Sequence, residues 1–389
     1  MKDFLPGINK AVAAEREKLT AVSEYILNHP ETGHHEVAAA AAQCEYLEKA
    51  GFRVTREFGG LKTAYSAEAG TGKPVIVIFS EYDALPGIGH ACGHHLITLS
   101  ALAAAVAVKA LIEKEKLSGT VRLVGSPAEE ALGGKIDLMR AGVLNDMDFA
   151  LITHPFYTTN VDPGNLAVGR YDVIYHGKAA HAAVSPELGV NALDAQVLLF
   201  NAIGLWRQQM PQGARVHGTI TKGGEMPNII PDYTSSFFYV RSLDNATQKQ
   251  MEARFEQIAQ GAALMTGCRL ELNKYPNSYS ANRHVKSLEE LARKTAAAAG
   301  FTLGEITQKI STDFADVSLR CPGVNLMFDA VGGGNVAALH SQDFLECAKK
   351  PFAFEQAFRA GAAVALTALA ILSDPATAKN ISGEFAGNF

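Results

Sequence analysis

The strongest restriction on the fold is an apolar run of residues followed by a long alanine-rich run. The first, KPVIVIFSEY at residues 73–82, lacks the polar alternation of a half-exposed strand. Such strands are buried on both faces in parallel sheets covered by helices. The second, LITLSALAAAVAVKALI at residues 96–112, is short for a membrane span of about 20 residues and contains Lys109. The pair therefore predicts a buried strand and a helix packed on the same sheet.

The rest of the chain shows two patterns. Strands and helices alternate up to about residue 169 and again from residue 282, and this order predicts an α/β domain with a mostly parallel, helix-covered sheet. Residues 170–281 contain strands of alternating polarity and two amphipathic helices, typical of a one-sided antiparallel sheet. We predict a larger domain from residues 1–169 and 282–389, interrupted by a smaller α+β domain at residues 170–281. The tail after residue 373 is expected to fray.

Charge and cysteine content narrow the class of protein. The 389 residues carry a net charge of −5 without a long run of lysines and arginines, so we expect no nucleic-acid partner and no binding to an anionic membrane. Five scattered cysteines, an odd number, argue against a disulfide framework. The first residues, MKDFLPGINKAVAAEREKL, lack the apolar core of a signal peptide. We therefore expect a protein of the reducing cytoplasm.

Ligand-type side chains lie at the ends of three predicted strands. They are Glu81, Asp83, Glu129, Glu130 and His154. Cys92 and His94 lie in the turn that opens the helix at residues 96–112. Parallel strands end at one edge of a sheet, and open α/β sheets bind ligands at that edge. We therefore expect all these side chains to converge there.

Their chemistry indicates a metal site. Thiol, imidazole and carboxylate groups together suit a divalent ion such as zinc. Gly93 permits the tight turn through which Cys92 and His94 reach one centre. Of the adjacent Glu129 and Glu130, one is suited to bind metal and the other to transfer a proton, the usual division in metal-assisted hydrolysis.

One alternative is an amidase with a cysteine nucleophile. Cys92, near a helix N-terminus, would attack the substrate, with His94 or His90 as its base. This interpretation leaves Glu129, Glu130, His154 and His340 without a role. It predicts activity that is sensitive to alkylation and insensitive to chelators.

Several spaced motifs resemble one enzyme family. They are EYDALPGIGHACGHH, SPAEE, THP, GKAAHAAVSPELGVNALDA, HGTITKGGEMPNIIPD, STDFADVS and ALHSQDF. In this order, over nearly the whole chain, they are similar to the M20 metallopeptidases. Within that family the chain most resembles the amidohydrolase branch that contains peptidase M20 domain-containing protein 2 and the aminobenzoyl-glutamate hydrolases. Many relatives carry Asp or Asn where this chain has His95, so the surroundings of the metal are expected to differ here. His90 and His95 are expected at the surface or behind the ligands.

The resemblance implies a site for two divalent metal ions. Cys92 would bridge them. Glu130 and His340 would complete the shell of one ion, and His94 and His154 that of the other. Zinc or manganese is expected, with cobalt and nickel as alternatives, because ligand type narrows the metal without fixing it.

It also implies the catalytic groups. Glu129 would be the general base for a water activated by the two ions, and Asp83 would orient a metal ligand. His181 would be the lid histidine that stabilises the oxyanion in a neighbouring subunit, which implies a homodimer formed through residues 170–281.

Three further residues match positions that hold the substrate. They are Asn228, Arg241 and His217. Arg241 can grip a carboxylate with two hydrogen bonds, and it is equally suited to pair with an acidic neighbour. His217 is equally well explained as an ordinary strand residue.

The function implied is hydrolysis of the amide bond of N-acyl amino acids or dipeptides. Candidate small-molecule substrates include aminobenzoyl-glutamate and β-alanyl-lysine, and the sequence leaves the preferred acyl group and amino acid open. A catalytically silent M20-like protein that binds a partner or metabolite is the second alternative. Every expected metal ligand is present. The variant Glu129→Gln would distinguish the hydrolase from the silent binding protein, since a silent binding protein should lose no measurable function.

Overall fold

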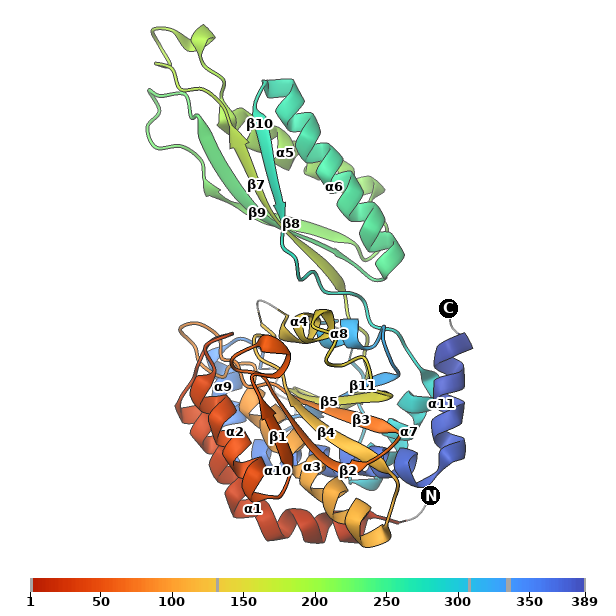
Figure 1. The fold of residues 1–389 in the computed structure, drawn as a ribbon. Coiled ribbons are helices and arrows are strands. Elements are labelled where there is room, and N and C mark those ends of the chain that lie inside the picture. The colour runs from red at the N-terminus through yellow and green to blue at the C-terminus, as the bar shows by residue number, and fades with distance from the viewer. Residues whose placement is uncertain (1–2, 131–132, 307–308, 334–336, 388–389) are drawn as a thin grey trace. The chain divides into compact units, whose positions relative to one another are not determined.

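The chain divides into two compact units, drawn as a ribbon in Figure 1. The computed structural model describes residues 3–130, 133–306, 309–333 and 337–387. A main unit is formed by Met1–Gly164 and Arg283–Phe389, and an inserted unit by Asn165–Asn282. The predicted insert, residues 170–281, lies within the second unit, which begins earlier because its first strand already starts at Ala167.

The main unit is built on a seven-stranded sheet in the order β1-β2-β4-β3-β5-β11-β6. The strands are β1 (Arg53–Arg56), β2 (Tyr65–Thr71), β3 (Val75–Ser80), β4 (Gly119–Gly125), β5 (Phe149–Phe156), β6 (Asn160–Val161) and β11 (Gly323–Asp329). The four strands β4, β3, β5 and β11 run parallel, and the outer strands pair antiparallel. Every residue of β3, β4 and β5 is buried, which explains their lack of polar alternation. The predicted α/β fold is confirmed.

Helices cover both faces of this sheet. They are α1 (Leu5–Asn28), α2 (Val37–Lys49), α3 (His94–Glu115), α4 (Gly134–Arg140), α7 (Lys286–Ala298), α8 (Phe314–Val317), α9 (Gln342–Ala348), α10 (Pro351–Ser373) and α11 (Pro375–Gly387). Figure 1 shows α4 and α8 on one face and α3 and α10 on the other. Two separate apolar clusters result, one on each face.

The central helices α3 and α10 are long and apolar enough to cross a membrane. In the structure, 89% and 83% of their most hydrophobic windows are buried. They pack against each other at Gly361, where a Cβ atom would lie 2.6 Å from the carbonyl oxygen of Ser100. The apolar run at residues 96–112 therefore belongs to the core of the main unit, as expected.

The C-terminal tail was expected to fray, and that expectation is wrong for residues 375–387. They form α11, with Ile381 buried. The carboxylate of Glu384 accepts hydrogen bonds from the backbone N–H groups of Lys286 and Ser287 at the start of α7. A distant carboxylate thus satisfies N–H groups that a helix start leaves without partners, and this anchors the tail.

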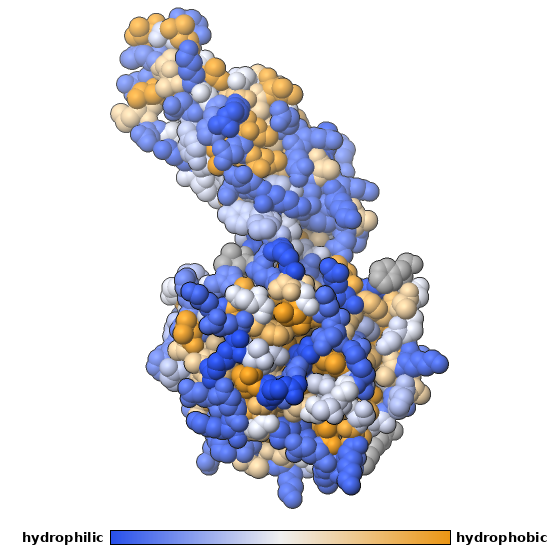
Figure 2. All heavy atoms as spheres, in the orientation of Figure 1, coloured by the Kyte–Doolittle hydropathy of each residue, from blue (hydrophilic) through white to orange (hydrophobic). Residues whose placement is uncertain are grey.

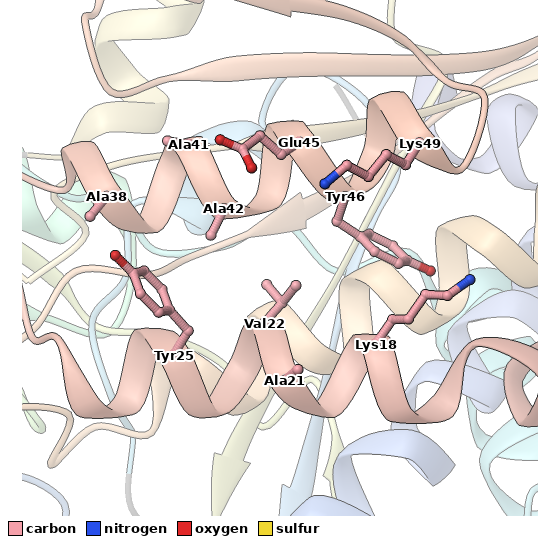
Figure 3. A pocket seen from close by; sticks show the side chains of 10 residues that line it. All are labelled: Lys18, Ala21, Val22, Tyr25, Ala38, Ala41, Ala42, Glu45, Tyr46 and Lys49. Carbon is pink, nitrogen blue, oxygen red and sulfur yellow. The ribbon is translucent and has the colours of Figure 1, made fainter.

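A shallow groove lies between α1 and α2 on the surface of the main unit (Figure 3). Its floor is made of small side chains, namely Ala21, Val22, Ala38, Ala41 and Ala42. Tyr25 lies toward one end of the groove and Tyr46 toward the other. Lys18 and Lys49 lie at the same end as Tyr46. None of the predicted site residues lines this groove.

The inserted unit is an antiparallel sheet covered on one face by two helices. Its strands β7 (Ala167–His176), β8 (Arg215–Lys222), β9 (Tyr233–Ser242) and β10 (Arg269–Lys274) lie in the order β10-β7-β9-β8. The helices are α5 (Ala192–Trp206) and α6 (Asn245–Thr266), and α6 is capped by the preceding Asp244, whose side chain accepts the N–H of Thr247. Burial alternates strictly along β9, as a sheet with one covered face requires.

Loops at one end of the inserted unit expose apolar side chains. Figure 2 shows them as orange spheres at the tip of this unit. The exposed residues are Val184, Leu188, Met226 and Ile229. The two loops that carry them are joined by a backbone bridge between His181 and Ile229.

Candidate active site

The predicted ligand residues meet at the carboxyl ends of the central strands. The last residue of β3, Ser80, pairs with the last residue of β4, Gly125. The segments that follow, with Glu81 and Glu129, therefore start at one edge of the sheet. His154 lies two residues before the end of β5, because this strand continues to Phe156.

A glycine sets the turn that delivers Cys92 and His94. Gly93 precedes the first residue of α3 and has a φ of 78°. A Cβ atom at this position would lie 2.7 Å from Cγ of Pro155. Both the left-handed backbone and the lack of space call for glycine, and the two flanking side chains are thereby directed to one place.

Two trios of potential metal ligands share Cys92. One consists of Cys92, His94 and His154, and the other of Cys92, Glu130 and His340; in each trio the ligand atoms lie within 4.8 Å of one another. The Sγ atom of Cys92 is 3.5 Å from Nε2 of His154. His340 is half-exposed, and its Nε2 lies 3.2 Å from Oε1 of Glu130. The structure thus brings together all five residues expected to bind metal.

Hydrogen bonds behind the trios orient both buried histidines. Nδ1 of His94 donates to Oδ1 of Asp83 over 2.8 Å, and Nδ1 of His154 donates to the carbonyl oxygen of Pro155 over 2.7 Å. Oδ2 of Asp83 accepts the backbone N–H of Glu130. Each imidazole therefore presents Nε2 to the site, the arrangement that metal-binding histidines adopt.

Burial and charge adjust the protonation of these groups. Burial lowers the pKa of His154 to about 4, so its ring is neutral at pH 7. Burial raises the pKa of Asp83, but the charge of His94 and their hydrogen bond outweigh this and leave the pKa below its usual range. Burial, aided by the negative charge of Glu130, raises the pKa of the Cys92 thiol. A thiol that stays protonated is a poor nucleophile, which weighs against the cysteine amidase.

Glu129 is buried beside the trios. Its ligand oxygen forms a third close group with those of Glu81 and His94. Burial raises the pKa of Glu129 well above its usual value, and the neighbouring carboxylates of Glu81 and Glu130 raise it further. A carboxyl group in this setting is suited to accept and return a proton.

A buried ion-pair network lies behind Glu81. The ammonium of Lys135, in α4, contacts Oε1 of Glu81 at 2.5 Å and Oδ1 of Asp313 at 2.6 Å. All three side chains are almost completely buried. The sequence identified Glu81 only as a ligand-type residue at a strand end and did not single out Lys135. The one available signal was the STDFADVS motif, which contains Asp313.

The residues present fit a divalent cation. Within the described part of the chain, neither Nε2 of His94 nor Oε2 of Glu81 has a hydrogen-bond partner, although both atoms are buried. Buried polar atoms are normally satisfied. Here the unsatisfied atoms lie among thiol, imidazole and carboxylate groups, which together form the donor set that zinc and related ions bind.

His90 and His95 stand apart from this cluster. Both are buried, so the surface placement considered for them is wrong. Their rings meet edge-on at 5.6 Å, and Nε2 of His95 donates to the carbonyl oxygen of Ala348. His95 therefore packs behind the turn and belongs to neither trio.

The inserted unit carries the remaining predicted residues in two groups. His181 and Asn228 lie on the adjoining tip loops, where the N–H of Ala182 donates to the carbonyl oxygen of Asn228. Nδ1 of His181 accepts the N–H groups of Ala183 and Val184. The proton of the neutral ring is therefore on Nε2, which makes this atom a donor.

The second group lies on the sheet face that the helices leave uncovered. His217 of β8 is opposite Tyr239 of β9, and their rings meet edge-on at 5.5 Å. The guanidinium of Arg241 lies 5.2 Å from the centre of the same Tyr239 ring. The structure thus joins His217 and Arg241 through one tyrosine.

Comparison with known proteins agrees with this arrangement. The sequence profile described as Peptidase family M20/M25/M40 matches residues 77–370. The chain is 34% identical to the Xaa-Arg dipeptidase of Mus musculus, over 97% of this chain and 92% of the relative. It is 36% identical to a p-aminobenzoyl-glutamate hydrolase polypeptide of Escherichia coli, over 74% of this chain and 64% of the relative.

A solved structure shares the whole fold. The YXEP protein of Bacillus subtilis, described as a dinuclear metal binding peptidase from the M20 family, superposes with a TM-score of 0.69 at 24% identity, covering 93% of this chain and 99% of that chain. The family profile covers most of the chain, and the Mus musculus relative matches it nearly end to end. The chain therefore belongs to the M20/M25/M40 peptidase family and is a metallo-amidohydrolase of that family.

Proposed function

We propose that this protein hydrolyses the amide bond of dipeptides or N-acyl amino acids with the help of two divalent metal ions. The observation that carries the proposal is the pair of ligand trios that share Cys92, with Glu129 beside them. Cys92, His94 and His154 would hold one ion, and Cys92, Glu130 and His340 the other. Zinc or manganese is the expected metal, with cobalt and nickel as alternatives.

Two bound ions would lower the pKa of a water molecule and stabilise negative charge on the scissile carbonyl oxygen. Glu129 then acts as general base. Its carboxylate takes a proton from the attacking water and returns it to the leaving amine as the C–N bond breaks, which leaves a carboxylic acid and an amine. Asp83 supports this step by holding the ring of His94 in one orientation.

The inserted unit would recognise the substrate. The N–H at Nε2 of His181 is suited to donate to the oxyanion of the tetrahedral intermediate. His217 and Arg241 would hold the carboxylate of the product amino acid, for which a guanidinium is well matched, and Asn228 would contact the substrate from the tip loops beside His181. We further propose that the protein is a homodimer joined through the inserted units, and that His181 serves the active site of the partner subunit.

The relatives suggest the first substrates to test. One acts on Xaa-Arg dipeptides and the other on p-aminobenzoyl-glutamate. Both substrates are amides whose amine product is an amino acid with a free α-carboxylate. The panel therefore consists of dipeptides with basic C-terminal residues, aminobenzoyl-glutamate and N-acyl amino acids. It includes substrates whose amino-acid side chain is positively charged and substrates in which it is negatively charged.

The test is turnover of this panel by metal-free protein, by protein reloaded with zinc or manganese, and by Glu129→Gln. Turnover should disappear on chelation and return on reloading. Glu129→Gln should retain its metal and lose about 10²–10⁴-fold in rate, the usual contribution of a general base. Activity that resists chelation but is abolished by alkylation of Cys92 would contradict the proposal.

A further inference from the structure

Glu81 has one carboxylate oxygen that the protein leaves unsatisfied. The residue follows β3 and is 1% exposed. Its Oε1 accepts from the ammonium of Lys135, but its Oε2 has no hydrogen-bond partner in the described residues. Leaving a carboxylate oxygen buried and unpaired costs free energy. The ligand set implied by the family resemblance does not include this residue.

The unsatisfied oxygen faces a second unsatisfied atom. Oε2 of Glu81 lies 3.7 Å from Nε2 of His94. Nδ1 of His94 donates to Asp83, so Nε2 is the ring atom left to bind a metal, and metal binding requires the neutral form of the ring. Oε2 of Glu81 and Nε2 of His94 are therefore two potential ligand atoms beside one space.

A cation in that space would satisfy both atoms. Zinc ligands lie about 2.0–2.2 Å from the metal, so two ligands on one ion are roughly 3.3–3.7 Å apart at tetrahedral to trigonal angles. The separation between Glu81 and His94 falls at the upper end of that range. Their ligand atoms also lie within 4.8 Å of that of Glu129, so the space belongs to the candidate active site.

We propose that Oε2 of Glu81 is an additional ligand of the ion held by His94. Lys135 and Asp313 act as positioning residues. Lys135 occupies Oε1 of Glu81, so that only one oxygen is offered to the metal. This inference rests on one part of the proposed function, the binding of the metal ions, and does not depend on the reaction.

The assignment also accounts for the charges. Lys135 supplies one positive charge against the two carboxylates of Glu81 and Asp313. The network therefore carries an excess negative charge deep in the protein, which a divalent ion at Glu81 would offset. With Glu81 and Glu130 both bound to metal, Glu129 is the carboxylate left to transfer protons.

The experiment is a metal titration of the full chain after chelator stripping. Zinc binding is followed by calorimetry in competition with a chelator, and the visible spectrum of the cobalt form reports the number of ligands. The variants are Glu81→Gln and the matched control Glu36→Gln. Glu36 is another buried glutamate, which accepts from Thr63 and from the N–H of Ala128 and belongs to no ligand group among the described residues.

Glu81→Gln should weaken the binding of one of the two ions. The loss of affinity should exceed the roughly 10–100-fold that follows when a residue that only orients a metal ligand is removed. It should also change the cobalt spectrum. Glu36→Gln should keep both ions and the wild-type spectrum. Lys135→Met should bind both ions and gain more in melting temperature on metal loading than wild type, because the ion then offsets two unpaired carboxylates.

The outcomes distinguish a failure of the Glu81 ligand from a failure of the proposed function. Wild type with two ions, together with a Glu81→Gln variant of unchanged affinity and spectrum, would overturn the role of Glu81 and leave the hydrolase proposal standing. Wild type that binds no metal would overturn the hydrolase proposal first. If Glu81→Gln does not fold, the triple variant Glu81→Gln/Lys135→Met/Asp313→Asn removes all three buried charges of the network and is titrated in its place.

Discussion

The Nζ atom of Lys135 lies 2.6 Å from Oδ1 of Asp313, a residue 178 positions later in the chain. The backbone N–H of Lys135 donates to the other oxygen of the same carboxylate. The start of α4 is thereby tied to the residue that precedes α8, and Glu81 ties both to the end of β3. This buried network supports the candidate active site from behind.

Removing the positive charge of Lys135 from this network should destabilise the protein strongly. In metal-free protein, Lys135→Met should lower the free energy of unfolding by about 3–5 kcal/mol, because two buried carboxylates lose their partner. The measurement is urea unfolding followed by circular dichroism. The double variant Lys135→Met/Asp313→Asn should recover part of the loss, and equal stability of the single and double variants would show that the carboxylates do not matter.

A second prediction concerns pH and Glu36. Burial, with the nearby charge of Asp83, raises the pKa of Glu36 to about 7 from 4.5. Between these values the unfolded chain loses the proton while the folded protein keeps it, so this group makes stability fall as the pH rises from about 4.5 to 7. The loss is at most about 3 kcal/mol.

Glu36→Gln should remove that part of the pH dependence. Unfolding free energies of metal-free wild type and variant are compared at pH 5 and pH 8. The variant should gain relative to wild type at the higher pH. Parallel pH profiles for the two proteins would show that Glu36 is ionised normally in the folded state.

Gly93→Ala should damage the turn that carries Cys92 and His94. The new methyl group would be too close to Pro155, and the left-handed backbone itself costs about 1–2 kcal/mol for a residue with a side chain. The expected result is lower stability together with reduced retention of zinc after desalting.

Gly87→Ala is the matched control for that change. Gly87 also has a positive φ, of 80°, but a Cβ atom there meets no other atom within 4 Å. It should show the cost of backbone strain alone and keep its zinc. Equal zinc loss in both variants would mean that the clash with Pro155 is unimportant.

A mixing experiment tests whether His181 acts in the partner subunit. His181→Ala and Glu129→Gln should each be nearly inactive alone. After subunit exchange, activity should return to roughly a quarter of the wild-type level, since half of the dimers are mixed and each contains one complete site. No recovery, with exchange verified by native mass spectrometry, would place His181 in the site of its own chain.

Local sequence pattern was sufficient for the core of the main unit and for much of the candidate site. The unbroken apolar strands β3, β4 and β5 could be recognised, and their shared edge brought Glu129 and Glu130 toward Cys92. Cys92, His94, Glu130 and His154 converge because strand ends in a parallel sheet leave few other arrangements. His340, which joins them, was expected only from the family resemblance.

The parts that were missed depend on contacts between distant segments. Lys135, at the start of a short helix, is indistinguishable from a solvated lysine until Asp313 is placed beside it. The tail was expected to fray because nothing local shows that Glu384 caps the start of α7. Burial of His95 likewise depends on α10, whose Phe354 ring lies beside it.

The position of the inserted unit within the chain has a consequence for protein synthesis. Residues 92–154 contain Cys92, His94 and His154, so a growing chain has this trio before the inserted unit is made. His340 comes only after it, as does β11, which pairs with β5 and completes the parallel part of the sheet. A ribosome-bound chain that ends within residues 165–282 therefore holds the donors proposed for one ion and lacks a donor proposed for the other, so the two proposed metal positions would arise at different times.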